Sequence, residues 1–311
     1  MQLRRVRRVT AALVFAAGLL GTGAGCATAD PGTAGTLRIV AAFYPLQFLS
    51  ERIGGDQVVV TNLVKPGAEP HDLELAPREA AELSSADLVV YLHGFQPAVD
   101  SAVEAVAQDR VYDVAGVQPL RAAPPGTEQG KPDQPRGNAG KDPHVWLDPT
   151  RLDGIAGQLA DRLAARDSAH AADYRARAAA LHTELTALDQ EYAAGLAHCQ
   201  RREIITSHAA FGYLADRYGL TQVPITGLSP ESEPTSARLA DLTAFARAHG
   251  VTTIFFETLV SPKVAETLAR EVGAQAKVLD PIEGVEAGSG ADYLSVMRLN
   301  LATLRTALGC S

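Results

Sequence analysis

The sequence is poor in cysteine, methionine and tryptophan: it has three, two and one of them in 311 residues. The cysteines have no Cys-x-x-Cys spacing, which argues against a zinc–thiolate site and against a paired-cysteine redox motif. The sequence also lacks a His-Glu-x-x-His motif, a Gly-x-Ser-x-Gly nucleophile elbow and a Gly-rich phosphate loop. These absences argue against the enzyme classes that carry those motifs.

The one long apolar run lies near the start of the chain and follows a cluster of arginines. Arg4, Arg5, Arg7 and Arg8 precede an apolar stretch from about Val9 to Leu20. A basic head, a short apolar core and small residues predict a secretory signal peptide. A transmembrane anchor would need roughly 20 apolar residues. The paired arginines also fit twin-arginine export, but ordinary secretion matches the pattern better.

Cys26 follows the small residues Gly23-Ala24-Gly25 and resembles the cysteine of a lipoprotein box. We therefore expect a signal peptide over residues 1–26 and a lipid on Cys26, although Gly23 stands where such boxes usually have an apolar residue. Cleavage after Ala27-Thr28-Ala29, a small-x-small site, is the alternative. The protein is expected outside the cytoplasm, with the membrane reached only through the lipid.

Loss of the four signal arginines changes the formal net charge from −8 to −12. This acidic balance argues against nucleic acid as a partner and suits a protein that handles cations. About 285 residues remain, enough for two lobes with their own cores. Cys199 and Cys310 form an even pair in an exported chain, so we predict a disulfide between them; two free buried thiols are the alternative.

Strand-like and helix-like stretches alternate in both halves of the chain, which predicts parallel sheets covered by helices, an α/β fold. The expected strands are 37–43, 58–64, 87–92, 203–206, 223–226, 251–256 and 276–279. The expected helices are 45–53, 76–84, 148–166, 168–197, one around Tyr213, 236–249, 263–272 and 293–308.

Two segments divide the chain. Residues 124–141 are rich in Pro, Gly and polar side chains and are expected to form a mobile loop. The helix over 168–197 has apolar residues three and four apart and would run roughly 45 Å, long enough to join two lobes. A helical hairpin broken near Asp189 is the alternative. The expected regions are an N-terminal lobe over 36–166, a linking helix over 167–198 and a C-terminal lobe over 199–311.

Four candidate ligands lie in comparable places. His71 lies in the loop after the second strand, His144 lies at the end of the polar loop, and His208 and Asp280 directly follow strands. Ligands of open α/β sheets bind beyond the carboxyl ends of the strands, so the four could meet in a cleft between lobes. Three imidazoles and a carboxylate suit tetrahedral Zn²⁺. Their separations of 73, 64 and 72 residues are unlike those of a local structural zinc site.

From about Leu37 onward the chain resembles the zinc- and manganese-specific substrate-binding proteins of bacterial ABC transporters, the ZnuA/TroA type. The matching motifs are Phe43-Tyr44-Pro45-Leu46, Pro70-His71-Asp72, Ala86-Asp87-Leu88-Val89-Val90, Pro143-His144-Val145-Trp146-Leu147-Asp148-Pro149, Thr206-Ser207-His208-Ala209-Ala210-Phe211-Gly212-Tyr213, Phe256-Glu257 and Leu279-Asp280-Pro281.

The resemblance implies two α/β lobes joined by one long helix, with the metal in the cleft between them and His71, His144, His208 and Asp280 as ligands. It also implies a monomer that captures metal and delivers it to an ABC permease. Members of the zinc type have His at the third ligand position, so His208 favours Zn²⁺ over manganese or iron. Many such members carry a His-rich loop before the second ligand, whereas residues 126–141 have no His.

Three acidic residues near the candidate ligands could orient an imidazole through the ring nitrogen that does not bind the metal: Glu69, Asp142 and Glu257. Solvated or helix-capping roles remain open for each of them. Two other functions also remain open. A surface adhesin needs only exposure outside the cell, and a zinc hydrolase needs an open coordination position and a general base. We expect a binding protein and not an enzyme, because four protein ligands leave no position for an activated water.

Overall fold

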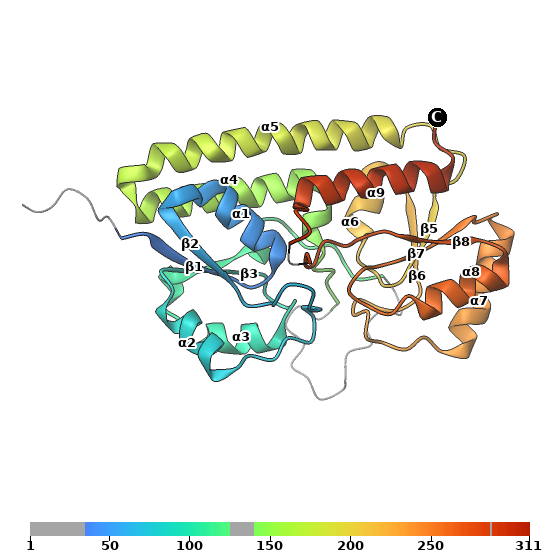
Figure 1. The fold of residues 1–311 in the computed structure, drawn as a ribbon, viewed down its shortest axis with the longest axis horizontal. Helices are drawn as coiled ribbons and strands as arrows, with labels where there is room; N and C mark the ends of the chain where they lie inside the picture. Colours follow the sequence, from blue (N-terminus) through green and yellow to red (C-terminus); the bar gives the residue numbers. More distant parts are fainter. Residues whose placement is uncertain (1–34, 125–139, 287) are drawn as a thin grey trace, which may run out of the picture. The chain divides into compact units, whose positions relative to one another are not determined.

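The computed structural model describes residues 35–124, 140–286 and 288–311 (Figure 1). Thr36–Ser311 form one compact unit, to which the description below applies. The expected signal peptide with Cys26, and most of the expected loop over 124–141, lie outside the described residues. Among the helices described, none combines the length and the hydropathy that a membrane-spanning helix requires.

The N-terminal lobe is built on a parallel four-stranded sheet with the order β2-β1-β3-β4. Its strands are β1 (Leu37–Ala41), β2 (Val58–Asn62), β3 (Leu88–Tyr91) and β4 (Val111–Asp113). Figure 1 shows helices on both faces, as parallel sheets require because both faces must be buried. These helices are α1 (Tyr44–Gly54), α2 (Pro77–Ser85), α3 (Pro97–Val103) and α4 (Pro149–Arg166).

The C-terminal lobe repeats the same topology, with the strand order β6-β5-β7-β8 and parallel pairing throughout. Its strands are β5 (Glu203–Thr206), β6 (Thr221–Pro224), β7 (Thr253–Phe256) and β8 (Gln275–Val278). Its helices are α6 (Gly212–Tyr218), α7 (Ser236–Ala248), α8 (Lys263–Val272) and α9 (Tyr293–Leu308). The prediction of two α/β lobes with parallel sheets is confirmed.

The two lobes are joined by α5 (Ala171–Gly195), a continuous helix of 25 residues that follows a short 3-10 turn over Ser168–His170. It packs on α1 and α4 of the N-terminal lobe and on α9 of the C-terminal lobe (Figure 1). Five large residues, at successive spacings of seven, four, three and four, form its buried face: Tyr174, Leu181, Leu185, Leu188 and Tyr192. Asp189 lies inside the unbroken helix, so the alternative of a hairpin broken there is wrong.

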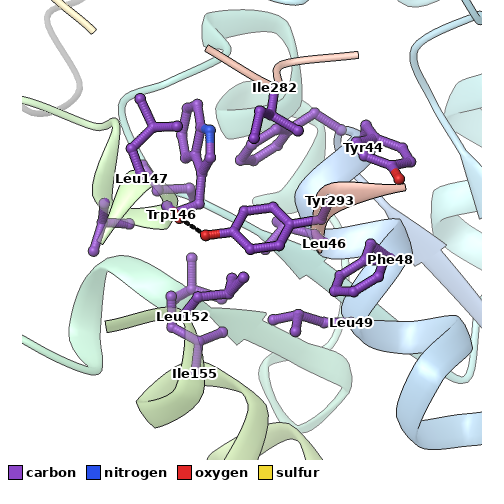
Figure 2. Close-up of a cluster of buried hydrophobic side chains, with 14 of the residues drawn as sticks. Tyr44, Leu46, Phe48, Leu49, Trp146, Leu147, Leu152, Ile155, Ile282 and Tyr293 are labelled. Atoms are coloured by element: carbon purple, nitrogen blue, oxygen red, sulfur yellow. Dashed lines mark hydrogen bonds between the residues drawn. The ribbon is translucent and has the colours of Figure 1, made fainter. Parts of the chain in front are cut away.

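Residues of both lobes share one hydrophobic core beside α1 (Figure 2). Trp146 from the N-terminal lobe and Tyr293 from α9 are 1% and 0% exposed, and the Tyr293 hydroxyl donates to the Trp146 carbonyl oxygen at 2.6 Å. The Trp146 indole N–H donates to the carbonyl oxygen of Pro281 at 2.7 Å. Trp146 therefore fixes the segment just after His144 to the segment that follows β8.

Cys199, just after α5, and Cys310, just after α9, form a disulfide in the structure. The bond closes a segment of 111 residues and ties the end of the linking helix to the C-terminal end of the chain. This is the predicted pairing.

Candidate metal centre

Four side chains converge between the two sheets: His71, His144, His208 and Glu283. Glu283 Oε1 lies 3.3 Å from His71 Nε2, 3.2 Å from His144 Nε2 and 3.2 Å from His208 Nε2. The Nε2 atoms of His144 and His208 lie 3.3 Å apart. All four potential ligand atoms lie within 4.8 Å of one another. Three of the four predicted ligands are thus brought together, and they are joined by a glutamate that was not predicted.

His71 lies in the loop between β2 and α2, His144 directly precedes a 3-10 turn, and His208 follows β5. The main chain of each histidine is held by a hydrogen bond. The His71 amide donates to Glu69 Oε2 at 2.9 Å, in the loop after β2. The His144 amide donates to Asp142 Oδ1 at 3.0 Å, just before the 3-10 turn Val145–Leu147. His208 follows β5, and its carbonyl oxygen accepts from Thr206 Oγ1 at 2.7 Å. These bonds set the positions from which the imidazoles reach the centre.

Two of the imidazoles are oriented by carboxylates on the side away from the centre. His144 Nδ1 lies 2.8 Å from Asp142 Oδ1, and His208 Nδ1 lies 2.9 Å from Glu257 Oε1. When a metal binds, a proton kept on Nδ1 by the carboxylate leaves the Nε2 lone pair free to coordinate the ion, the arrangement usual for metal-bound histidine. Asp142 and Glu257 therefore occupy the orienting positions expected of them.

Glu69, the third acidic residue expected to orient an imidazole, contacts the main chain of His71 instead of its ring nitrogen. Its Oε2 accepts the His71 amide, while Oε1 lies 4.0 Å from His71 Nε2 and has no hydrogen-bond partner although it is buried. Burial raises the pKa of Glu69. Glu69 thus holds the loop that carries His71.

The cluster is withdrawn from solvent: the His144, His208 and Glu283 side chains are at most 1% exposed, and that of His71 is 9% exposed. Burial alone would raise the pKa of Glu283, but the charges of His71 and His208 and hydrogen bonds from His144 and His208 hold it well below its usual value. Burial alone would lower the pKa of His208, but the Glu257 and Glu283 carboxylates raise it well above its usual value. The site therefore stabilises positive charge at its centre.

Asp280 lies near this cluster but outside it, which corrects its expected place as the fourth ligand. Its Oδ1 accepts the amide of Ile282 at 2.7 Å, and its Oδ2 accepts the hydroxyl of Thr258 at 2.9 Å. Both carboxylate oxygens are therefore engaged within the C-terminal lobe, and burial raises the pKa of Asp280. Glu283, three residues further along, reaches the histidines.

The distances from Glu283 Oε1 to the three imidazole nitrogens match those in a tetrahedral zinc site. Zinc binds imidazole nitrogen and carboxylate oxygen at about 2.0–2.2 Å, which places neighbouring ligand atoms about 3.3 Å apart. The Glu283 Oε1 atom lies 3.2–3.3 Å from each of the three Nε2 atoms. The donor set of three imidazoles and one carboxylate is likewise of the kind that zinc prefers.

Residues 39–307 match a protein family described as ZnuA, zinc-uptake complex component A, periplasmic. The chain is 35% identical over 279 residues to the zinc-binding lipoprotein AdcA of Streptococcus pneumoniae, covering 87% of this chain and 56% of that protein. It is 34% identical to the high-affinity zinc uptake system protein ZnuA of Bacillus subtilis, with 88% of both chains covered.

Among solved structures, the Zn(II)-bound ZnuA-like domain of Streptococcus pneumoniae AdcA matches with a TM-score of 0.74 and 34% identity. The match covers 88% of this chain and 99% of that domain. The chain spans only about half the length of the streptococcal AdcA proteins. The similarity thus extends over nearly all of this chain and over one part of those longer proteins.

Proposed function

Because the chain belongs to the ZnuA family of zinc-uptake components, we propose that it captures Zn²⁺ outside the cytoplasmic membrane and delivers it to an ABC import permease. The ligands are His71, His144, His208 and Glu283. The observation that carries this proposal is the meeting of three Nε2 atoms and one carboxylate oxygen at distances of 3.2–3.3 Å from that oxygen.

The choice of zinc over manganese or iron rests on the three imidazoles. Imidazole suits zinc, whereas carboxylate-rich sites suit harder ions such as Mn²⁺. Asp142 and Glu257 add carboxylates behind the ring nitrogens, where they increase the basicity of the imidazoles without acting as ligands. The names of the relatives agree with this choice.

A binding protein fits this site better than a zinc hydrolase. Four protein ligands fill a tetrahedral zinc ion and leave no position for an activated water. The surface-adhesin alternative depends on exposure outside the cell alone and is not favoured by the zinc-binding relatives. Export, and anchoring through a lipid on Cys26, are part of the proposal; the names of the AdcA relatives include that of a lipoprotein. The protein would act as a monomer, with the permease as its partner.

The test is the replacement of His208, measured by competition for Zn²⁺ and Mn²⁺ against a chelator of known affinity. His208→Ala leaves three protein ligands, so zinc affinity should fall at least a hundredfold, about 2.7 kcal/mol. His208→Glu restores a harder donor and should shift the preference from zinc toward manganese.

His182→Ala is the control, because His182 lies on α5 with a side chain 61% exposed and pairs with Asp153. It should change neither affinity. If His208→Ala bound zinc like the unmodified protein, the proposed site would be wrong.

A further inference from the structure

The loop that delivers Glu283 to the histidines has an unusual backbone. Ile282 has a φ of 59°, and among the described residues it alone, apart from glycines, has a positive φ. A β-branched residue rarely adopts this left-handed conformation, because its Cβ crowds the backbone. Such a conformation persists only where the surroundings hold it. The residue after it is the carboxylate ligand, so the left-handed turn decides where Glu283 points.

Asp280 ties this turn to the loop that follows β7. Its Oδ1 accepts the Ile282 amide at 2.7 Å, and its Oδ2 accepts the Thr258 hydroxyl at 2.9 Å. The main chain of Asp280 is held in turn by Asn300 of α9: the Asp280 amide donates to Asn300 Oδ1 at 2.9 Å, and Asn300 Nδ2 donates to the Asp280 carbonyl oxygen at 2.7 Å. The main chain of Asp280 is thus held in place, and its carboxylate restrains the amide of Ile282.

The side chain of Ile282 supplies the second restraint. It is fully buried and packs in the core shared by the two lobes (Figure 2). The Pro281 carbonyl oxygen accepts the Trp146 indole N–H at 2.7 Å. The loop is therefore held by its side chain, by its carbonyl group and by the carboxylate of Asp280.

We propose that Asp280 is a positioning residue for metal binding: its carboxylate holds Ile282 in the left-handed conformation and so turns Glu283 toward the three histidines. This inference rests on the proposed function. Asp280 acts through Glu283 and is not itself a ligand, since both of its oxygens are engaged by Ile282 and Thr258. Its contribution to zinc affinity should vanish when Glu283 is absent.

The experiment measures Zn²⁺ affinity by chelator competition for Asp280→Asn, Asp280→Ala, Glu283→Ala and the double variant Asp280→Ala/Glu283→Ala. Asparagine keeps an oxygen that accepts the Ile282 amide, so Asp280→Asn should stay within threefold of the unmodified protein. Alanine removes that acceptor, and Asp280→Ala should lose at least tenfold. Glu283→Ala should lose at least a hundredfold.

The double variant separates positioning from a general structural effect. If Asp280 acts only through Glu283, the double variant should bind zinc within threefold of Glu283→Ala, because the two losses are then not additive. A full further tenfold loss in the double variant would overturn the inference. So would unmodified affinity in Asp280→Ala, or a loss in Asp280→Asn as large as in Glu283→Ala.

Asp292→Ala is the matched control. Asp292 also accepts a backbone amide, that of Ser295 at 2.8 Å, but it caps α9 and carries no ligand. It should lower the melting temperature of the metal-free protein and leave zinc affinity within twofold. If Asp280→Ala does not fold, zinc affinities of Asp280→Asn and Glu283→Ala are compared instead. A large loss of affinity in Asp280→Asn with none in Glu283→Ala would make Asp280 the ligand and overturn the inference.

The same series distinguishes failure of this inference from failure of the proposed function. If His208→Ala and Glu283→Ala both bind zinc like the unmodified protein, the metal site itself is wrong. If both lose affinity and Asp280→Ala does not, only the positioning role of Asp280 is wrong.

Discussion

The hydroxyl of Tyr213, on α6 of the C-terminal lobe, donates a hydrogen bond to the carbonyl oxygen of Asp142, in the N-terminal lobe, at 2.9 Å. The same hydroxyl accepts the amide of Arg121 at 2.9 Å, and the guanidinium carbons of Arg121 and Arg151 lie 5.7 Å and 4.9 Å from the ring centroid. Because Asp142 also orients His144, this contact joins the second lobe to a proposed ligand of the first.

Replacing Tyr213 by phenylalanine tests that connection. Tyr213→Phe keeps the ring but leaves the Arg121 amide and the Asp142 carbonyl oxygen without this partner. We expect a loss of about 1–2 kcal/mol in the free energy of unfolding and a roughly tenfold loss of zinc affinity, about 1.4 kcal/mol. Urea denaturation and chelator competition measure the two effects.

Tyr218→Phe is the control for Tyr213→Phe. The Tyr218 hydroxyl donates to Asp189 Oδ1 at 3.0 Å, away from the metal ligands. Tyr218→Phe should lower the free energy of unfolding by a similar amount and leave zinc affinity unchanged. Equal zinc affinities in the two variants would show that the Tyr213 contact is structural only.

Gly212, next to Tyr213, leaves room for the ion pair between Arg121 and Asp142, the carboxylate that contacts His144 Nδ1. A Cβ at this position would lie 1.7 Å from Arg121 Nη1 and 2.6 Å from Asp142 Oδ2, which are themselves 3.6 Å apart. Gly212→Ala should displace the guanidinium and disturb the Asp142 carboxylate, at a cost of about 1–3 kcal/mol in stability. Zinc affinity should fall by roughly tenfold, about 1.4 kcal/mol.

The control for Gly212→Ala is Gly157→Ala on α4, where a Cβ would meet nothing within 4 Å. At an exposed helix position alanine is more favourable than glycine by up to about 1 kcal/mol. This variant should therefore be as stable as the unmodified protein or more stable. Zinc affinity should not change. Unmodified zinc binding in Gly212→Ala would mean that Asp142 holds His144 without Arg121.

The disulfide should be detectable as an absence of free thiols. We expect thiol titration of the unfolded, unreduced protein to detect neither Cys199 nor Cys310, and reduction to release both. Replacing both by serine should lower the free energy of unfolding by about 2–5 kcal/mol, with little effect on zinc affinity. Two titratable thiols before reduction would contradict the pairing.

Asp189 should contribute stability that depends on pH. Hydrogen bonds from Arg217 hold the pKa of Asp189 below its usual value, against burial, which would raise it. Since the folded-state pKa is the lower one, the stabilisation is present above the unfolded-state pKa of about 3.9 and is lost as the pH falls through the folded-state value. Asp189→Asn should therefore cost about 1 kcal/mol at neutral pH, because the pair is partly exposed and screened by solvent.

The measurement is urea denaturation of the metal-free protein at neutral pH and at roughly pH 3 or below, past the usual aspartate pKa. The difference between Asp189→Asn and the unmodified protein should shrink in acid. Glu191→Gln is the control, because the Glu191 and Arg298 side chains are 41% and 45% exposed and should stabilise less. A constant difference across pH would mean that the Asp189 carboxylate charge contributes nothing.

The three histidines could be placed from the sequence because each follows a strand or closes a loop within a recognisable motif. The proposed fourth ligand, Glu283, could not be placed in this way. Asp280 and Glu283 lie in the same loop, and which of them faces the histidines depends on the left-handed conformation of Ile282. Sequence preference argues against that conformation in a β-branched residue, so only the three-dimensional packing around the loop decides it.

Most strands and helices could also be predicted, because β-branched strands alternate with helices of regular apolar spacing. The exceptions are short: β4 has three residues and α3 has seven, too few for either periodicity to show. The strand expected over 223–226 begins two residues earlier, at Thr221, which pairs with Glu203 of β5. Register of this kind depends on the neighbouring strand and is not encoded locally.

Trp146 is the only tryptophan in the chain. Its ring centroid lies 5.2 Å from that of His144, and its indole N–H donates to the carbonyl oxygen of Pro281, in the loop that carries Glu283. Any change in how the two lobes meet around the metal would therefore alter the surroundings of this one indole. We therefore expect tryptophan emission to change on metal capture and release, without any added label.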